Sequence, residues 1–330
     1  MLFRSQTERE RQTSNLSELK LTKKTIDTKK VFGVDVPFKV EGFKEMSDWV
    51  PAVDESYVFD KATTEAILAG FMFNKRVMVQ GMHGTGKSTH LEQIAARLNW
   101  PMVRINLDSH ISRIDLLGKD VITLEDGKQV TTFQEGLLPW AIQNPVALVF
   151  DEYDAGRPDV MFVIQRILEV DGKLTMLDQN RVIHPNTSFR LFATTNTVGL
   201  GDMTGLYHGT QQINQGQLDR WHILTSLNYL ESDQEEKIIL GKTSFVSKEE
   251  KALLKQMIQV ANLTRKGFAN GDISTVMSPR TVLSWAQNYV IFNDLEHSFA
   301  LSFLNKCDDG EKPIVEEYFQ RCCGSSQDRS

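Results

Sequence analysis

Short apolar runs rich in β-branched and aromatic residues alternate along the chain with stretches in which apolar residues recur every three or four positions. The runs are RVMVQ (76–80), MVRIN (102–106), VALVF (146–150), RLFATT (190–195) and HILTSLNYL (222–230). Between two of them lies PDVMFVIQRILEV (158–170), whose helical apolar stripe we assign to the core. Strands that alternate with helices predict an α/β domain with a largely parallel sheet.

The pattern changes after residue 231. Apolar β-type runs give way to amphipathic helices, among them EEKALLKQMIQVANL (249–263) and SPRTVLSWAQNYVIF (278–292). We therefore expect four segments along the chain. They are an N-terminal arm, partly disordered, over 1–45, an α/β domain over 46–230, an all-helical domain over 231–320 and a flexible tail over 321–330.

Two stretches interrupt the alternation and predict β-hairpins. VITLEDGKQVTTF (121–133) contains Asp126-Gly127 between β-prone flanks, a pair that favours a tight hairpin turn. GKLTMLDQNRVIHP (172–185) has a turn-like centre between similar flanks and directly precedes RLFATT. Each stretch can also be a simple loop excursion.

Composition narrows the class of protein. The length of 330 residues favours about two domains, and the formal net charge of -6 argues against broad affinity for nucleic acid or anionic membranes. No stretch approaches the roughly 18 apolar residues of a spanning helix, and no apolar signal core opens the sequence. The three cysteines, Cys307, Cys322 and Cys323, lack CxxC spacing. We expect a cytoplasmic protein with reduced thiols that binds neither membrane nor nucleic acid.

The segment GMHGTGKS (81–88) fits the phosphate-loop pattern G-x-x-x-x-G-K-[ST], and it lies between a predicted strand and a predicted helix, as that loop requires. Its glycines let backbone N–H groups wrap around phosphate oxygens, and the helix N-terminus adds its dipole. Lys87 would reach the β- and γ-phosphates of ATP, and the Ser88 hydroxyl would ligate Mg²⁺. The candidate nucleotide-binding residues here are Gly81, Met82, His83, Gly84, Thr85, Gly86, Lys87, Ser88 and Thr89.

Two further runs end on polar residues that suit phosphate chemistry. VALVF is followed by Asp151 and Glu152. We predict that Asp151 holds Mg²⁺ with the nucleotide and that Glu152 polarises the water that attacks the γ-phosphate. RLFATT is followed by Asn196, whose amide can orient that water or sense the γ-phosphate. An ordinary turn asparagine is the competing interpretation.

In this order the motifs resemble those of the AAA+ ATPases: a Walker A loop, a Walker B strand, a sensor 1 asparagine, an arginine before the last strand, and a helical lid. The resemblance extends over roughly residues 45–305. It implies a P-loop fold with a five-stranded parallel sheet between helices and a C-terminal all-helical lid domain. The two predicted hairpins are similar to those of the branch that contains MoxR-like ATPases and the magnesium chelatase ATPase subunit.

Four longer stretches are similar to the ATPase subunits of aerobic cobaltochelatases: residues 31–43, 104–120, 133–174 and 196–221. This resemblance implies ATP-driven insertion of Co²⁺ into hydrogenobyrinic acid a,c-diamide in cobalamin synthesis. It also implies a homo-oligomeric, hexameric ring and two kinds of partner, a von Willebrand A-type subunit and a large subunit that binds the tetrapyrrole. The histidines of this chain show no metal-ligand spacing, so we expect cobalt and tetrapyrrole to bind the partners.

Two arginines gain roles from the resemblance. An arginine at the place of Arg220 reaches the γ-phosphate held by a neighbouring subunit in AAA+ rings, and such a finger is worth roughly 10³–10⁵ in rate. A salt bridge within the chain, to Asp219 or another acid, is the alternative. Arg280 follows Ser278 and Pro279 at the start of a predicted lid helix and resembles sensor 2, acting on its own or the neighbour's nucleotide. A solvated arginine at a helix start is the competing interpretation.

Two other functions stay open from the sequence. One is a MoxR-like chaperone that activates another metalloenzyme through a von Willebrand A-type partner. The other is a nucleic-acid motor, because related ATPases include helicases. The acidic net charge and the absence of a basic, aromatic-rich module in the sequence count against the motor.

Overall fold

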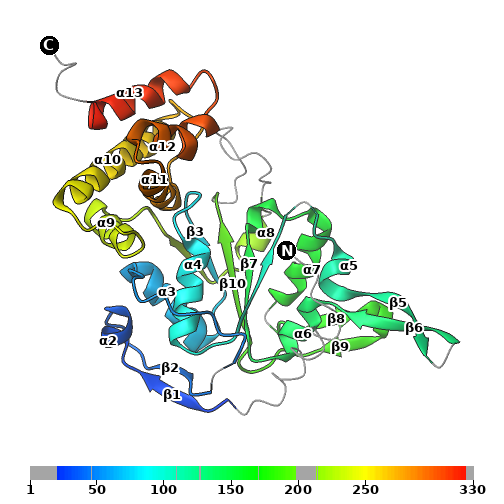
Figure 1. Ribbon diagram of the computed structural model, residues 1–330. Helices are drawn as coiled ribbons and strands as arrows, with labels where there is room; N and C mark the ends of the chain where they lie inside the picture. The colour runs from blue at the N-terminus through cyan, green and yellow to red at the C-terminus, as the bar shows by residue number, and fades with distance from the viewer. Residues whose placement is uncertain are drawn as a thin grey trace.

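The computed structural model describes residues 21–45, 47–108, 110–125, 128–169, 171–197, 213 and 215–324. A twisted sheet lies between helices, and a separate group of helices, yellow to red in Figure 1, packs beside it. The sheet has five parallel strands in the order β11-β3-β10-β7-β4, which confirms the predicted fold class. These strands are β3 (Val77–Gln80), β4 (Met102–Asn106), β7 (Ala147–Asp151), β10 (Arg190–Thr195) and β11 (Ile223–Ser226).

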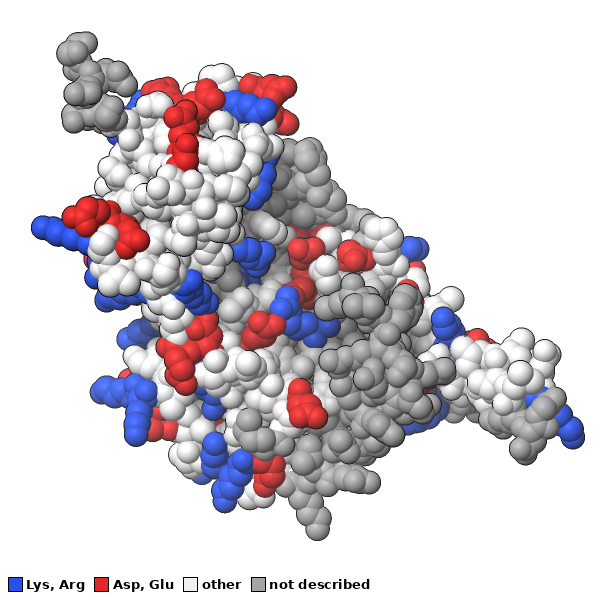
Figure 2. Space-filling view, in the orientation of Figure 1, with Lys and Arg blue, Asp and Glu red and all other residues white. Residues whose placement is uncertain are grey.

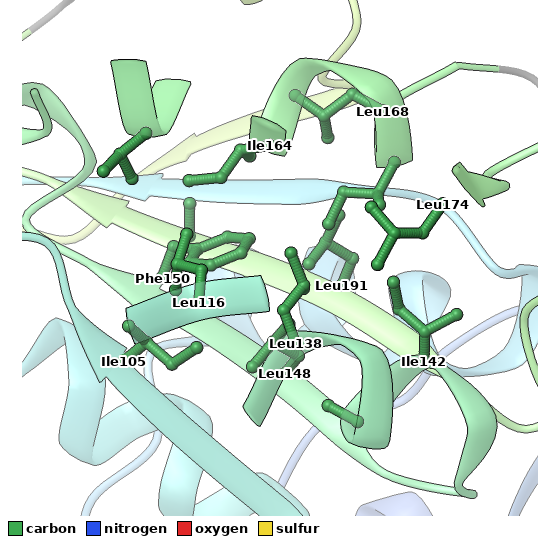
Figure 3. Close-up of a cluster of buried hydrophobic side chains, with 14 of the residues drawn as sticks. Ile105, Leu116, Leu138, Ile142, Leu148, Phe150, Ile164, Leu168, Leu174 and Leu191 are labelled. Carbon is green, nitrogen blue, oxygen red and sulfur yellow. The ribbon is translucent and has the colours of Figure 1, made fainter. Parts of the chain in front are cut away.

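Hydrophobic clusters on both faces of the sheet hold the α/β domain together. Successive strand residues alternate between them: Val77 and Val79 face one cluster, and Met78 faces the other. Figure 3 shows the second cluster, in which Phe150 of β7 lies close to Leu116. Helices α3 (Lys61–Phe73) and α4 (Lys87–Arg97) cover the cluster that contains Val77. Helices α5 (Arg113–Leu117), α6 (Leu137–Gln143) and α7 (Pro158–Ile167) cover the cluster that contains Met78.

The C-terminal helices form a core of their own. They are α9 (Ser232–Leu240), α10 (Lys248–Asn270), α11 (Pro279–Phe292), α12 (Leu295–Ser302) and α13 (Lys312–Cys323). Trp285 is fully buried at the centre of this core, with its ring 4.9 Å from that of Phe299. Residues 227–324, all of them described, contain helices and loops but no strand, in agreement with the predicted helical lid. None of the described helices is long and apolar enough to cross a membrane.

Residues 23–43, which we assigned to an N-terminal arm, fold onto the α/β domain. Strand β1 (Lys23–Ile26) pairs antiparallel with β2 (Val40–Phe43), and the short helix α2 (Thr28–Phe32) lies between them. Phe43 is buried, with its ring 4.4 Å from that of Trp100. Its partner Trp100 lies far along the chain, so a search for local periodicity gives no sign that this segment is ordered.

Both predicted hairpins are present. β5 (Gly118–Glu125) pairs with β6 (Lys128–Glu135), and this hairpin projects from the body of the molecule (Figure 1). Its turn, residues 126–127, lies outside the described residues. β8 (Leu174–Met176) and β9 (Arg181–Ile183) form the second hairpin. The glycine-rich stretch of residues 198–210, which precedes the predicted arginine finger, also lies outside the described part of the chain.

Candidate active site

The phosphate-loop segment joins the carboxyl end of β3 to the start of α4. Gly84 and Gly86 have φ angles of 77° and 87°, a region that residues with a Cβ rarely adopt. The loop also needs glycine for space, because a Cβ on Gly84 would overlap the side chain of Ser278 and one on Gly81 would overlap the carbonyl of Leu227. The loop is therefore held between the end of β11 and the lid domain.

Lys87 is buried and its ammonium group turns toward the loop that precedes it. Its Nζ donates hydrogen bonds to the carbonyl oxygens of Gly81 (2.6 Å) and Met82 (3.0 Å) and to Oδ1 of Asn196 (2.8 Å). Burial lowers the pKa of Lys87 to about 8, against the attraction of nearby carboxylates. These three oxygen atoms accept the N–H groups of Lys87 that phosphate oxygens would accept when a nucleotide is bound.

Asp151, at the end of β7, is buried and surrounded by donors. Ser88 Oγ and Thr194 Oγ1 donate to its Oδ1 at 2.6 and 2.8 Å, and Arg104 Nε donates to its Oδ2 at 2.7 Å. Arg104 also pairs with Glu92 of α4. A hydroxyl beside a carboxylate is an oxygen donor set that suits Mg²⁺, so these residues fit the ion predicted from the sequence.

Glu152 has an unusual backbone conformation. Its φ is 55° and its ψ is 48°, and the other described residues with positive φ are asparagines or glycines. Its backbone N–H donates to Thr194 Oγ1 at 3.2 Å. A residue with a long side chain rarely adopts this region, and such strain is concentrated at functional sites. Glu152 thus lies at the carboxyl edge of the sheet, next to Asp151 and half-buried.

Asn196 follows β10 at the same edge. Its side chain contacts Lys87, and its backbone N–H donates to Oδ2 of Asp154 at 3.1 Å. Four predicted site residues from three parts of the sequence therefore meet at the carboxyl ends of β3, β7 and β10: Lys87, Ser88, Asp151 and Asn196. Parallel strands bring their carboxyl ends to one edge, which is why these distant motifs converge.

Arg220 lies at the opposite end of the sheet. His222, two residues on, donates its backbone N–H to the carbonyl of Arg76 (3.0 Å), just before β3 begins, whereas the phosphate loop starts at Gly81. At about 3.3 Å per residue, roughly 16 Å of extended chain separates Arg76 from Gly81. The guanidinium of Arg220 pairs with Glu169, with Nη2 to Oε1 at 2.9 Å and Nε to Oε1 at 3.2 Å. Arg220 therefore does not reach the phosphate loop of its own chain.

Arg280 lies near the loop, on the lid domain. It is exposed in the first turn of α11, two residues after Ser278, whose Oγ caps the helix by accepting from the Thr281 N–H. Because Ser278 packs on Gly84, this turn begins directly beside the phosphate loop. Figure 2 shows charged side chains of both signs where the lid domain meets the α/β domain.

A small aromatic cluster lies beside α4. Tyr57 shares a hydrogen bond with Nδ1 of His90 (3.0 Å), and Thr64 shares one with Nε2 (2.9 Å). Burial lowers the pKa of His90 to about 4, so its ring is neutral at pH 7. Phe59 packs edge-on against Tyr57 with ring centroids 5.1 Å apart. The hydroxyl of Tyr57 faces Gly86 of the loop and would lie 3.9 Å from a Cβ at that position.

Comparisons with known proteins show the family of this chain. The family described as AAA domain (dynein-related subfamily) matches residues 76–208. The aerobic cobaltochelatase subunit CobS of Sinorhizobium sp is 61% identical over 301 residues, which are 91% of each chain. The chain belongs to the CobS family. An AAA domain in a CobS-family chain makes it an ATP-binding ATPase.

Other similar proteins are more distant from this CobS-family chain. An uncharacterized protein of Staphylococcus haemolyticus (strain JCSC1435) is 23% identical over 251 residues, 76% of this chain and 91% of that protein. The RuvB Holliday junction branch migration motor of Thermotoga maritima aligns with 83% of this chain and 73% of its own, at 15% identity and a TM-score of 0.44.

Three charged residues that contact predicted site residues escaped the sequence analysis. Arg104 could have been noticed in the sequence, because it is the one charged residue within the apolar run MVRIN. Asp154 lies three residues after the Walker B aspartate, inside a stretch that reads as an ordinary polar loop. Glu169 lies at the end of a helical stripe, where a solvated acid is common. Only the folded chain places these residues against Asp151, Asn196 and Arg220 respectively.

Proposed function

We propose that this CobS-family chain hydrolyses ATP as a ring subunit of the aerobic cobaltochelatase and thereby drives Co²⁺ insertion into hydrogenobyrinic acid a,c-diamide in cobalamin biosynthesis. The identity of 61% to CobS and the AAA domain support the assignment. The main support for the mechanism is the position of the site residues in the fold. Lys87, Ser88, Asp151 and Asn196 meet at one edge of the sheet, while Arg220 lies at the other.

Hydrolysis uses residues of that first edge. Lys87 exchanges its carbonyl partners for oxygen atoms of the β- and γ-phosphates. Ser88 and Asp151 would hold Mg²⁺, which would neutralise charge on the phosphates when bound. Glu152 accepts the proton of the attacking water at its carboxylate, and the Asn196 amide orients that water.

The position of Arg220 supports a shared site. Since it cannot reach its own loop, it acts on a nucleotide only if the loop of a second copy comes to it. A closed ring of copies, which we take to be a homohexamer, provides this contact at every interface. Glu169 holds the guanidinium in one orientation until the γ-phosphate of the neighbour replaces it.

Cobalt and tetrapyrrole bind partner subunits in this proposal, one of von Willebrand A type and one large subunit. In the described part of the chain, no group of three or more His, Cys, Asp or Glu residues is arranged to hold a metal ion. Cys307, Cys322 and Cys323 form no disulfide with one another, which fits a reducing cytoplasmic compartment.

Mixed rings test the shared site. Arg220→Ala subunits and Glu152→Gln subunits are each expected to lose ATPase activity alone. Mixed together, they regain part of it, because a site with Glu152 then meets a neighbour with Arg220. Arg157→Ala, which removes an exposed arginine paired with Asp159, is the control and keeps full activity. Hydrolysis that stays absent at every mixing ratio, with ring assembly intact, contradicts the role of Arg220 in trans.

The cobaltochelatase assignment has a separate test. Cobalt insertion is measured with the two partner subunits, with and without this chain and ATP. We expect insertion only with both present and none with Lys87→Ala. Insertion that proceeds without this chain would overturn the assignment.

A further inference from the structure

Asp154 is a buried carboxylate at the candidate active site, and the motifs above assign no role to it. It lies in the single turn η1 (Tyr153–Ala155), which follows the Walker B strand, and its residue is 1% exposed. A carboxylate is costly to bury unless its oxygen atoms accept hydrogen bonds. Its partners therefore indicate what it does.

The Oδ2 atom of Asp154 holds the chain that leaves β10. It accepts from the backbone N–H of Asn196 (3.1 Å), the backbone N–H of Thr197 (2.9 Å) and Oγ1 of Thr197 (2.9 Å). Thr195 Oγ1 donates to the Thr197 carbonyl at 2.9 Å and fixes the same turn from the other side. Asn196 cannot rotate relative to the Walker B turn without breaking these bonds.

The same carboxylate also acts on Lys87. Asn196, held by Asp154, accepts a hydrogen bond from Lys87 Nζ through its own Oδ1. The second oxygen of Asp154, Oδ1, is buried and has no hydrogen-bond partner among the described residues. Burial lowers the pKa of Lys87 to about 8, and Asp154 is the carboxylate that opposes this most. Walker B, sensor 1 and Walker A are thus joined through one side chain.

We propose that Asp154 is a positioning residue for ATP hydrolysis, which holds the backbone of Asn196 so that its amide stays beside Lys87 where the γ-phosphate binds. The inference rests on the proposed function. It has two separable parts: geometry, supplied by the three bonds to Oδ2, and charge, supplied by the whole carboxylate.

Two substitutions separate these parts. Asp154→Asn keeps one oxygen to accept the three bonds and removes the charge, whereas Asp154→Ala removes both. Asp159→Asn makes the same charge change at an exposed residue of α7 and is the control. Thr197→Val removes only the hydroxyl donor and leaves the two backbone donors in place.

The first measurement needs no nucleotide. Hydrogen exchange of the Asn196 and Thr197 amides is followed in the nucleotide-free full chain. A hydrogen bond to a charged group is worth about 1.5–3 kcal/mol, so we expect Asp154→Ala to raise exchange by roughly tenfold or more. Asp159→Asn should stay within about threefold of the wild type, and Asp154→Asn, which keeps the acceptor but loses its charge, should fall between the two. Exchange that is unchanged in Asp154→Ala would overturn the proposal, whatever happens to ATPase activity.

The second measurement is steady-state ATP hydrolysis. Asp154→Ala is expected to lower kcat at least about tenfold with KM changed less than about threefold, because Asn196 acts on the water rather than on the bound nucleotide. Asp154→Asn should keep most of kcat. Faster exchange with an unchanged kcat would reduce Asp154 to a structural residue and sink the proposal. If the wild-type chain hydrolyses no ATP, the proposed function fails while the exchange result still stands.

Should Asp154→Ala fail to fold, Thr197→Val carries the test. Loss of one donor to Oδ2 should speed exchange of the Thr197 amide a few-fold and lower kcat by a similar factor. Wild-type values for both quantities would contradict the role of Asp154.

Discussion

Replacing Glu235 by glutamine should destabilise the lid domain, because it breaks an ion pair sealed from water. The side chain of Glu235 is 0% exposed and that of Arg265 is 7% exposed. Two guanidinium nitrogens donate to the two carboxylate oxygens at 2.7 and 2.8 Å. Arg265 also donates to the Met277 carbonyl (3.0 Å) and lies over the ring of Tyr229, 4.4 Å from its centroid.

The size of the effect follows from this burial. Breaking a buried pair by removing one partner costs about 3–5 kcal/mol, because the remaining charge stays buried without its counter-ion. The next residue in the same helix gives a matched control. Glu236 faces Lys255 at 3.8 Å, and Lys255 is 63% exposed, so this pair is worth about 0–1 kcal/mol.

Urea unfolding followed by circular dichroism measures both variants. We expect Glu235→Gln to lower the free energy of unfolding of the lid by about 3–5 kcal/mol and Glu236→Gln by less than about 1 kcal/mol. ATP affinity should fall with Glu235→Gln as well, because Tyr229, which packs on Arg265, donates its hydroxyl to the His83 carbonyl in the phosphate loop (2.8 Å). Equal losses in the two variants would refute the reasoning.

Three further outcomes are expected. Gly84→Ala should abolish ATP binding in calorimetry because its methyl group overlaps Ser278, while Gly271→Ala, at a φ of 81° in open space, should cost about 1–2 kcal/mol of stability and leave binding intact. Because Lys87 has a pKa of about 8 and binds phosphate only when protonated, ATP affinity should fall as pH rises from 8 to 10, and binding at pH 9 should take up a proton, seen as buffer-dependent heat; equal heats in all buffers would contradict this. His90 has a pKa of about 4 when folded against 6.5 when unfolded, so the unfolded chain takes up the proton first and stability falls by up to about 3 kcal/mol as pH drops from 6.5 to 4. His90→Gln should flatten that part of the acid-unfolding curve, and an equal slope would argue against it.

Local chemistry predicts several elements with their observed bounds. β4 and β10 span the predicted runs 102–106 and 190–195, because both runs place apolar side chains on the buried faces of the sheet. Helix α11 starts at Pro279 because Ser278 caps it and proline suits a first turn.

Bounds that depend on a partner differ from the prediction. β11 ends at Ser226, although the apolar run continues to Leu230. Its neighbour β3 ends at Gln80, where the chain turns into the phosphate loop, so the later residues have no strand to pair with. Helix α10 extends beyond the predicted 249–263 to Asn270, where Gly271 in the left-handed conformation stops it.

The sequence by itself determined which residues make up the phosphate loop, the strand that ends on Asp151, and the fold class, because glycine sterics and hydrophobic periodicity act between near neighbours. The tertiary structure decided what surrounds them. Arg220 pairs with Glu169 at the far edge of the sheet, and Asp154 holds the backbone of Asn196. These contacts join residues more than forty positions apart, as the separations of 51 and 42 show, and a polar residue in a loop carries no local sign of the partner it will meet.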